Sequence, residues 1–120
     1  MAAAPAPVYT LALLRGLDVS EEIFEYLAKI DATLEPHGGR FVIHGGGRIE
    51  VIEGEFDGFL VVLEFPDRDS AHAWYASDAY REILPLRTRN STATAMIVDG
   101  VPAGYRATDL LELLRGADGE

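Results

Sequence analysis

The chain has 120 residues, 48% of them hydrophobic, which suits a single domain with a hydrophobic core of ordinary size. Its net charge of −10 argues against nucleic acid and anionic membrane surfaces as partners, because both need clustered basic residues and only ten Lys and Arg are spread along the chain. The sequence contains no cysteine, which excludes disulfides, thiolate nucleophiles and Cys-ligated metals.

The first seven residues are small and uncharged, and they are interrupted by Pro5 and Pro7. We expect a flexible lead over residues 1–7 rather than a signal peptide, which would begin with basic residues and continue with an apolar run. No apolar run in the sequence approaches the roughly 20 residues of a membrane span. These features predict a cytoplasmic protein.

The first strand is predicted over Val8–Leu14, and a helix follows it. Asp18 and Glu21 have the spacing of a capping box, so Asp18 is predicted to cap this helix. Pro36 and the pair Gly38-Gly39 end it. The apolar residues that recur at helical spacing and should face the core are Ile23, Leu27, Ile30 and Leu34.

Two strand-like segments come next. The second strand is predicted over Arg40–His44, interrupted by a glycine bulge at Gly45–Gly47 and resumed over Arg48–Glu53. Phe59–Phe65 is the third strand, and Pro66 ends it because proline has no N–H for a sheet hydrogen bond.

Two capped helices and a last strand complete the pattern. Asp67 is predicted to cap a helix over Arg68–Ala76. Ser77 is predicted to cap a second helix over Asp78–Leu86. The fourth strand is predicted over Thr92–Val98. The order strand–helix–strand–strand–helix–strand is typical of a ferredoxin-like α+β fold with a four-stranded antiparallel sheet.

We therefore predict one domain over residues 8–100, with residues 101–120 as a C-terminal extension. Within that extension, Thr108 is predicted to cap a short helix over Asp109–Arg115. This leucine-rich helix is expected to dock either on the domain or on a partner subunit.

Both faces of the predicted sheet are apolar. Tyr9, Leu11 and Leu13 alternate with Val8, Thr10, Ala12 and Leu14 in the first strand, and the third strand has the same character. Two helices can cover only one face, and an antiparallel sheet open to water would alternate apolar with polar residues. The pattern predicts a homodimer in which the second faces of two sheets pack into a barrel.

Several short motifs resemble one family, the domain of unknown function 1330 (DUF1330), over about Val8 to Gly100. The residues that carry this resemblance are Gly38-Gly39-Arg40-Phe41, Gly45-Gly46, Glu53-Gly54, Glu64-Phe65-Pro66, Ala71, Trp74-Tyr75, Ser77, Tyr80 and Arg87. The resemblance implies a ferredoxin-like domain of the dimeric α+β barrel superfamily. That superfamily includes cofactor-free monooxygenases, isomerases, dehydratases and haem-linked enzymes, beside members with no known chemistry.

The family itself supplies no catalytic residues. Two departures from its pattern stand out. His44 occupies a position where the family often has an arginine, and the extension beyond Val101 exceeds the usual domain.

His44 and Glu64 are the candidate catalytic residues. Histidine has a pKa that suits proton transfer near neutral pH. Glu64 is charged within an otherwise apolar strand and therefore needs a partner such as His44, Arg40 or Arg87, or access to water. A hairpin of the second and third strands would bring His44 near Glu64 as an acid–base pair; the alternative is that both are structural.

Trp74, Tyr80 and Arg87 are the candidate ligand-binding residues. Tyr80 and Arg87 lie seven positions apart and so share a helix face, where a phenol and a guanidinium could hold a carboxylate or an enolate. The alternative is that they fix the helix to the sheet, and that Trp74 is core packing. The three histidines lack metal-ligand spacing, so no metal and no cofactor are expected.

Two functions follow from these residues. The first is a small-molecule site between sheet and helices, in a cofactor-independent enzyme of the isomerase, cyclase, lyase or monooxygenase type. The second is a non-catalytic homodimeric module for binding or assembly, in which the same residues hold the structure together. An open pocket would favour the first, and a pocket filled by protein side chains the second.

Overall fold

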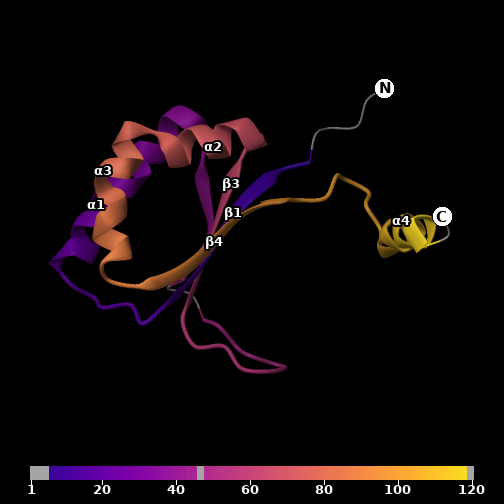
Figure 1. Ribbon diagram of the computed structural model, residues 1–120, viewed down its shortest axis with the longest axis horizontal. Helices are drawn as coiled ribbons and strands as arrows, with labels where there is room; N and C mark the ends of the chain where they lie inside the picture. The colour runs from indigo at the N-terminus through magenta and orange to yellow at the C-terminus, as the bar shows by residue number, and fades with distance from the viewer. Residues whose placement is uncertain (1–5, 46–47, 119–120) are drawn as a thin grey trace.

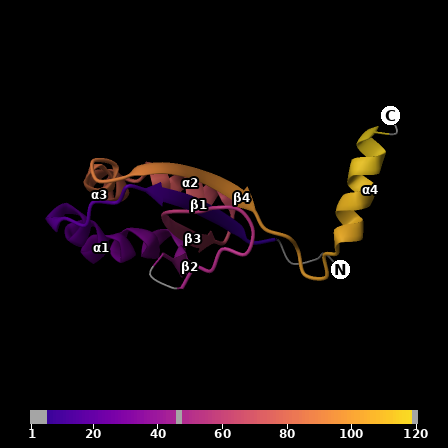
Figure 2. The ribbon, with the colours of Figure 1, turned by 90° about the horizontal axis from the view of Figure 1, so that it is seen from below.

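The computed structural model describes residues 6–45 and 48–118, and it contains a four-stranded antiparallel sheet with three helices on one face (Figures 1 and 2). Its strands lie in the order β2-β3-β1-β4. The elements of the domain are β1 (Val8–Arg15), α1 (Glu21–Leu34), the short 3₁₀ helix η1 (Glu35–His37), β2 (Arg40–His44), β3 (Phe59–Phe65), α2 (Arg68–Ala76), α3 (Asp78–Thr88) and β4 (Thr92–Asp99). The predicted ferredoxin-like fold is confirmed.

Helix α1 begins at Glu21, two residues later than it would if Asp18 were its N-cap. Ser20 is the N-cap residue, with an extended backbone. The backbone N–H of Asp18 donates to the carbonyl of Asn90 at 2.8 Å, and the Ser20 hydroxyl donates to Oδ1 of Asn90 at 3.0 Å. The prediction that Asp18 caps the helix is wrong, because these bonds hold Asp18 against the loop that follows α3.

Gly38 and Gly39 end the first helical segment, as predicted. Gly38 has a left-handed backbone with φ of +70°, which glycine adopts without strain. A Cβ atom on Gly39 would lie 2.7 Å from the ring of Phe65 and 2.9 Å from the side chain of Leu34. Only glycine allows the chain to pass this close to the core.

Strand β2 ends at His44, and the chain from 48 to 58 is a loop that extends away from the sheet (Figure 1). The predicted strand over Arg48–Glu53 is therefore wrong. The bulge lies earlier, at Val42, because Phe41 pairs with Leu63 while Ile43 already pairs with Val62. The predicted bulge at Gly45–Gly47 falls partly on residues 46–47, which lie outside the described residues.

The two capped helices form as predicted. The backbone N–H of Ser70 donates to Oδ1 of Asp67 at 2.7 Å, and that of Tyr80 donates to Oγ of Ser77 at 3.3 Å. Because Ser77 also ends α2, it sets the angle between α2 and α3 and fixes which side chains of α3 point at the sheet.

The core lies between the helices and one face of the sheet. Val8 of β1 pairs with Phe65 of β3, so the two side chains share this face. The buried residues of the core are Val8, Tyr26, Ile30, Leu34, Leu63, Phe65, Ala71, Trp74, Tyr80 and Ile83.

The opposite face of the sheet, which we call the outer face, is also apolar and carries no helix. Leu11 pairs with Val62 on one side and with Met96 on the other, and Val62 pairs with Ile43, so these four side chains form one row. Ile43 is 45% exposed and Met96 39% exposed. The apolar second face that the alternation predicted is present.

The C-terminal extension forms the helix α4 (Ala107–Asp118), which stands apart from the sheet (Figures 1 and 2). It begins at Ala107, before the predicted cap Thr108, and Oδ2 of Asp109 accepts a hydrogen bond from the N–H of Arg106 at 3.1 Å. Its leucines are 44–70% exposed, so the alternative that it docks on its own domain is wrong. Within the described residues, none of the helices is long and apolar enough to cross a membrane.

Candidate functional site

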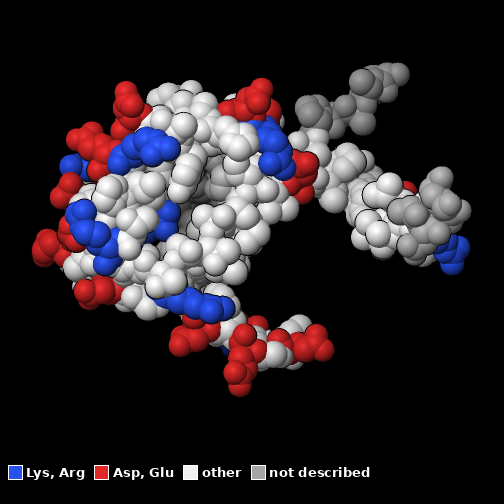
Figure 3. All heavy atoms as spheres, in the orientation of Figure 1, with Lys and Arg blue, Asp and Glu red and all other residues white. Residues whose placement is uncertain are grey.

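A cavity of about 700 Å³ lies between the helix-covered face of the sheet and the three helices. The space-filling view shows the molecule hollowed at this place (Figure 3). Its volume falls in the range of sites that hold small molecules. The side chains and backbone that line it come from every strand and from all three helices, and they include Thr10, Ala12, Leu14, Ile23, Phe24, Tyr26, Leu27, Ile30, Phe41, His44, Phe59, Val61, Leu63, His72, Trp74, Tyr75, Tyr80, Arg87, Ala95 and Ile97.

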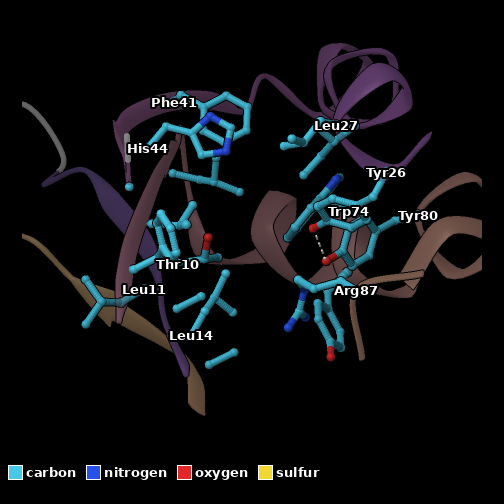
Figure 4. A pocket seen from close by; sticks show the side chains of 18 of the residues that line it. Thr10, Leu11, Leu14, Tyr26, Leu27, Phe41, His44, Trp74, Tyr80 and Arg87 are labelled. Atoms are coloured by element: carbon cyan, nitrogen blue, oxygen red, sulfur yellow. Dashed lines mark hydrogen bonds between the residues drawn. The ribbon is translucent and has the colours of Figure 1, made fainter. Parts of the chain in front are cut away.

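Two tyrosines from different helices meet in the cavity wall. The hydroxyls of Tyr26 on α1 and Tyr80 on α3 lie 2.8 Å apart and form a hydrogen bond (Figure 4). Burial, with a further contribution from Tyr80, raises the pKa of the Tyr26 hydroxyl far above its ordinary value. Tyr26 is therefore a neutral hydrogen-bonding group at physiological pH.

Arg87 lies in the last turn of α3, two turns after Tyr80, and is only 7% exposed. Its near polar neighbours are the hydroxyls of Tyr80 and Tyr26. Burial by itself lowers the pKa of Arg87, but the two tyrosines together outweigh it and raise the pKa above its ordinary value. No carboxylate of the described residues lies within ion-pair distance of Arg87, so the cavity contains a guanidinium without an anionic partner.

Trp74 forms part of the same wall and is held rigidly. Its indole Nε1–H donates to Oγ1 of Thr33 at 3.0 Å, and the Thr33 hydroxyl donates in turn to the carbonyl of Ile30 at 2.7 Å. The ring centroids of Trp74 and Tyr80 are 4.1 Å apart. The indole N–H is already bonded within the protein, so Trp74 offers a ligand an aromatic surface and no hydrogen bond.

His44 lines the cavity from the end of β2. Its ring stacks on Phe41 with centroids 4.1 Å apart and planes inclined by 15°. Partial burial lowers the pKa of His44 below its ordinary value, and the opposing effect of Asp31 is smaller. At neutral pH the imidazole is therefore mainly uncharged and can accept a proton.

Glu64 does not lie in this cavity. It pairs with Arg40 across β2 and β3 on the outer face, and its Oε1 accepts a hydrogen bond from Nε of Arg40 at 2.8 Å. His44 pairs instead with Val61, whose side chain lines the cavity. The predicted proximity of His44 and Glu64 is wrong; Arg40, one of the three partners predicted for Glu64, is the partner observed.

The structure thus brings four of the five predicted site residues to one cavity and places the fifth elsewhere. His44 and Arg87 lie on opposite sides of the cavity, with Trp74 and Tyr80 in the wall beside Arg87 (Figure 4). Tyr26 was missed by the sequence prediction. Its position three residues after Ile23 and four before Ile30 was the available indication, because that spacing places all three on the inner side of α1.

The described part of the chain has no group of three or more His, Asp or Glu side chains that could hold a metal ion. The chemistry that the cavity can perform with its own residues is proton transfer at His44, and the binding of an oxyanion at Arg87.

Comparison with known proteins identifies the fold and the family. Residues 7–101 match the family model of the domain of unknown function DUF1330. None of the curated proteins matches the chain in sequence.

Three solved structures resemble this one at low sequence identity. RPA0582, a protein of unknown function from Rhodopseudomonas palustris, is 18% identical over 82% of this chain and 85% of its own, with a TM-score of 0.59. A dimeric ferredoxin-like protein of unknown function from Jannaschia sp. CCS1 is 17% identical over 78% and 96%, with a TM-score of 0.58. SnoaB, a cofactor-independent oxygenase from Streptomyces nogalater, is 13% identical over 87% and 100%, with a TM-score of 0.52. At these identities the likeness extends to the fold alone.

Proposed function

Because the chain belongs to the DUF1330 family, whose description assigns no activity, we propose its function from the cavity itself: it binds a small, largely apolar molecule between the sheet and the helices. The observation that carries this proposal is an apolar cavity of about 700 Å³ that the protein's own side chains leave open. A domain held together only by packing would fill such a space, because core voids larger than a water molecule are few and costly.

Titration with a neutral apolar fluorophore, N-phenyl-1-naphthylamine, tests the proposal. We expect saturable binding of one probe per chain, with a blue-shifted emission that reports an apolar environment. The absence of saturable binding to the folded protein would refute a small-molecule site.

The proposal extends to catalysis without a cofactor. His44 faces the cavity as an uncharged base, and Arg87 lies on the opposite side (Figure 4). A ligand held by an oxygen at Arg87 would present its far end to His44, where a proton can be removed from carbon and returned at another position. SnoaB, a cofactor-independent oxygenase, has this fold, so the fold is compatible with chemistry that needs no cofactor.

The His44→Ala variant tests the catalytic part once a ligand that the wild-type protein converts has been identified. General acid–base catalysis contributes about 10²- to 10⁴-fold to a rate, so we expect a loss of that order in turnover with little change in ligand affinity. Glu64→Gln is the matched control, since Glu64 lies on the outer face, and its turnover should stay near that of the wild type. Equal rates for His44→Ala and the wild type would remove His44 from the mechanism.

A non-catalytic binding module is the second candidate, and one observation favours it. The ring of His44 stacks on Phe41 and has no carboxylate from Glu64 to orient it. In this case the ligand would be recovered chemically unchanged after incubation with the protein. Glu64 lies outside the cavity with Arg40 as its partner, so the proposal gives it no catalytic role.

We also propose that the chain forms a homodimer through its outer face. The apolar row of Ile43, Val62, Leu11 and Met96, in which Ile43 is 45% and Met96 39% exposed, supports this, as does the dimeric ferredoxin-like relative from Jannaschia. A cytoplasmic location stays a prediction.

A further inference from the structure

The charge of the cavity differs from that of the rest of the molecule. The chain has a net charge of −10, yet no Asp, Glu or Lys is among the residues that line the cavity. Arg87 is its one fixed charge, and its other basic side chains are the two histidines His44 and His72. A cationic ligand would meet repulsion here and find no counter-ion, whereas an anionic ligand would find one.

The guanidinium of Arg87 has more hydrogen-bond donors than its surroundings have acceptors. It carries five N–H groups, and its near polar neighbours are two phenol oxygens that already bond to each other. Among the described residues, no fully enclosed side-chain nitrogen or oxygen lacks a hydrogen-bond partner. The unpaired donors of Arg87 are therefore not fully enclosed, and Arg87 lines the cavity, so a ligand in the cavity can reach them.

A charged group buried to this degree is costly to keep unless something pairs with it. The planar fork of a guanidinium fits two oxygens of one carboxylate. A phosphate ester carries up to two negative charges, and the lining contains no second Arg or Lys to balance the second one. The site therefore suits a single negative charge spread over two oxygens.

We propose that the ligand is an apolar carboxylic acid, bound as its carboxylate to Arg87 beside the Tyr26 and Tyr80 hydroxyls, with its hydrocarbon part extending toward Phe41 and His44. This inference rests on the proposed function, since it names the ligand class of the same cavity. Trp74 and Tyr80 would flank the carboxylate end, and the apolar wall would hold the rest.

The test compares acids with their neutral methyl esters of nearly equal size. Binding of 2-naphthoate and decanoate, one ring-shaped and one chain-like, is measured by calorimetry or by displacement of N-phenyl-1-naphthylamine, beside methyl 2-naphthoate and methyl decanoate. For whichever acid fits the cavity better, we expect the acid to bind about tenfold or more tightly than its methyl ester. The reason is that the ester cannot form the charge-assisted bidentate pair between a carboxylate and the Arg87 guanidinium.

Substitutions in α3 test whether Arg87 causes the preference for the acid over its ester. Arg87→Met should abolish the preference for the acid, and Arg87→Lys should keep a weaker one. Arg81→Met removes a charge from the exposed side of the same helix and should leave the preference unchanged.

Two failures can be told apart. If the neutral probe binds but neither acid is preferred over its ester in the wild-type protein, the carboxylate inference is overturned and the proposed function stands. If the neutral probe does not bind either, the proposed function falls as well. The wild-type comparison does not depend on whether Arg87→Met folds.

Discussion

At the scale of single residues, hydrogen bonds within the protein fix the aromatic side chains that surround Arg87. Thr33 is 5% exposed. Its hydroxyl accepts a hydrogen bond from the Trp74 indole N–H and donates one to the carbonyl of Ile30. This fixes the Trp74 ring against Tyr80 and leaves Arg87 as the one charged donor of the wall. If the cavity binds a ligand as proposed, a rigid wall with a single cation would distinguish one end of that ligand from the other.

Replacing Thr33 tests this arrangement. Thr33→Val leaves the buried Nε1–H of Trp74 without an acceptor, which costs about 1–3 kcal/mol of unfolding free energy. Thr33→Ser keeps the hydroxyl and should cost clearly less. Urea unfolding followed by tryptophan fluorescence measures both variants, and equal losses in the two would contradict a role for this hydrogen bond.

Individual residues also show where sequence reasoning reaches its limit. Arg87 and Tyr80 could be identified as a pair from their spacing, because helical periodicity fixes which side chains share a face. The position of His44 relative to Glu64 could not, because it depends on strand register. A tight hairpin turn sets register, but β2 and β3 are joined by a long loop, and the extra residue Val42 shifts the pairing.

At the scale of elements, the boundaries that local chemistry determines were predicted well. Asp67 and Ser77 cap their helices, and Gly38 ends the first helical segment. The segment from Arg48 to Glu53 was not predicted correctly, although its sequence alternates in a strand-like way. A strand needs a neighbour, and β3 begins only at Phe59, so this segment has nothing to pair with in its own chain.

The outer face of the sheet leads to a prediction about assembly. In the wild-type protein we expect a species of twice the 13.1 kDa chain mass by light scattering after gel filtration. Met96→Glu places a charge at the β4 end of the apolar row and should shift the protein to the monomer, because an unpaired carboxylate is costly to bury. Its side chain is 39% exposed in the single chain, so the fold itself should persist.

Met96→Leu is the matched control and should remain dimeric. A wild-type protein that elutes as a monomer would contradict the outer-face dimer, as would a dimer that survives Met96→Glu.

At the scale of the whole molecule, the domain and its extension are distinct. The radius of gyration is 17.0 Å, whereas a compact chain of this length has about 14 Å. Helix α4 and the loop 48–58 both contribute to this difference, because both extend away from the sheet (Figures 1 and 2). The leucines of α4 are exposed. An isolated helix of 12 residues is marginal in water, so α4 is expected to gain its stability from a partner surface.

The central claim is that the cavity is a binding site, and one titration tests it most directly. Ala12 lines the cavity from β1, and Ala12→Phe fills part of it, whereas Ala73→Phe adds the same volume on the exposed side of α2. With N-phenyl-1-naphthylamine, we predict that Ala12→Phe weakens binding about tenfold or more while Ala73→Phe binds like the wild type. If Ala12→Phe is folded and binds the probe as tightly as the wild type, the cavity is not the site.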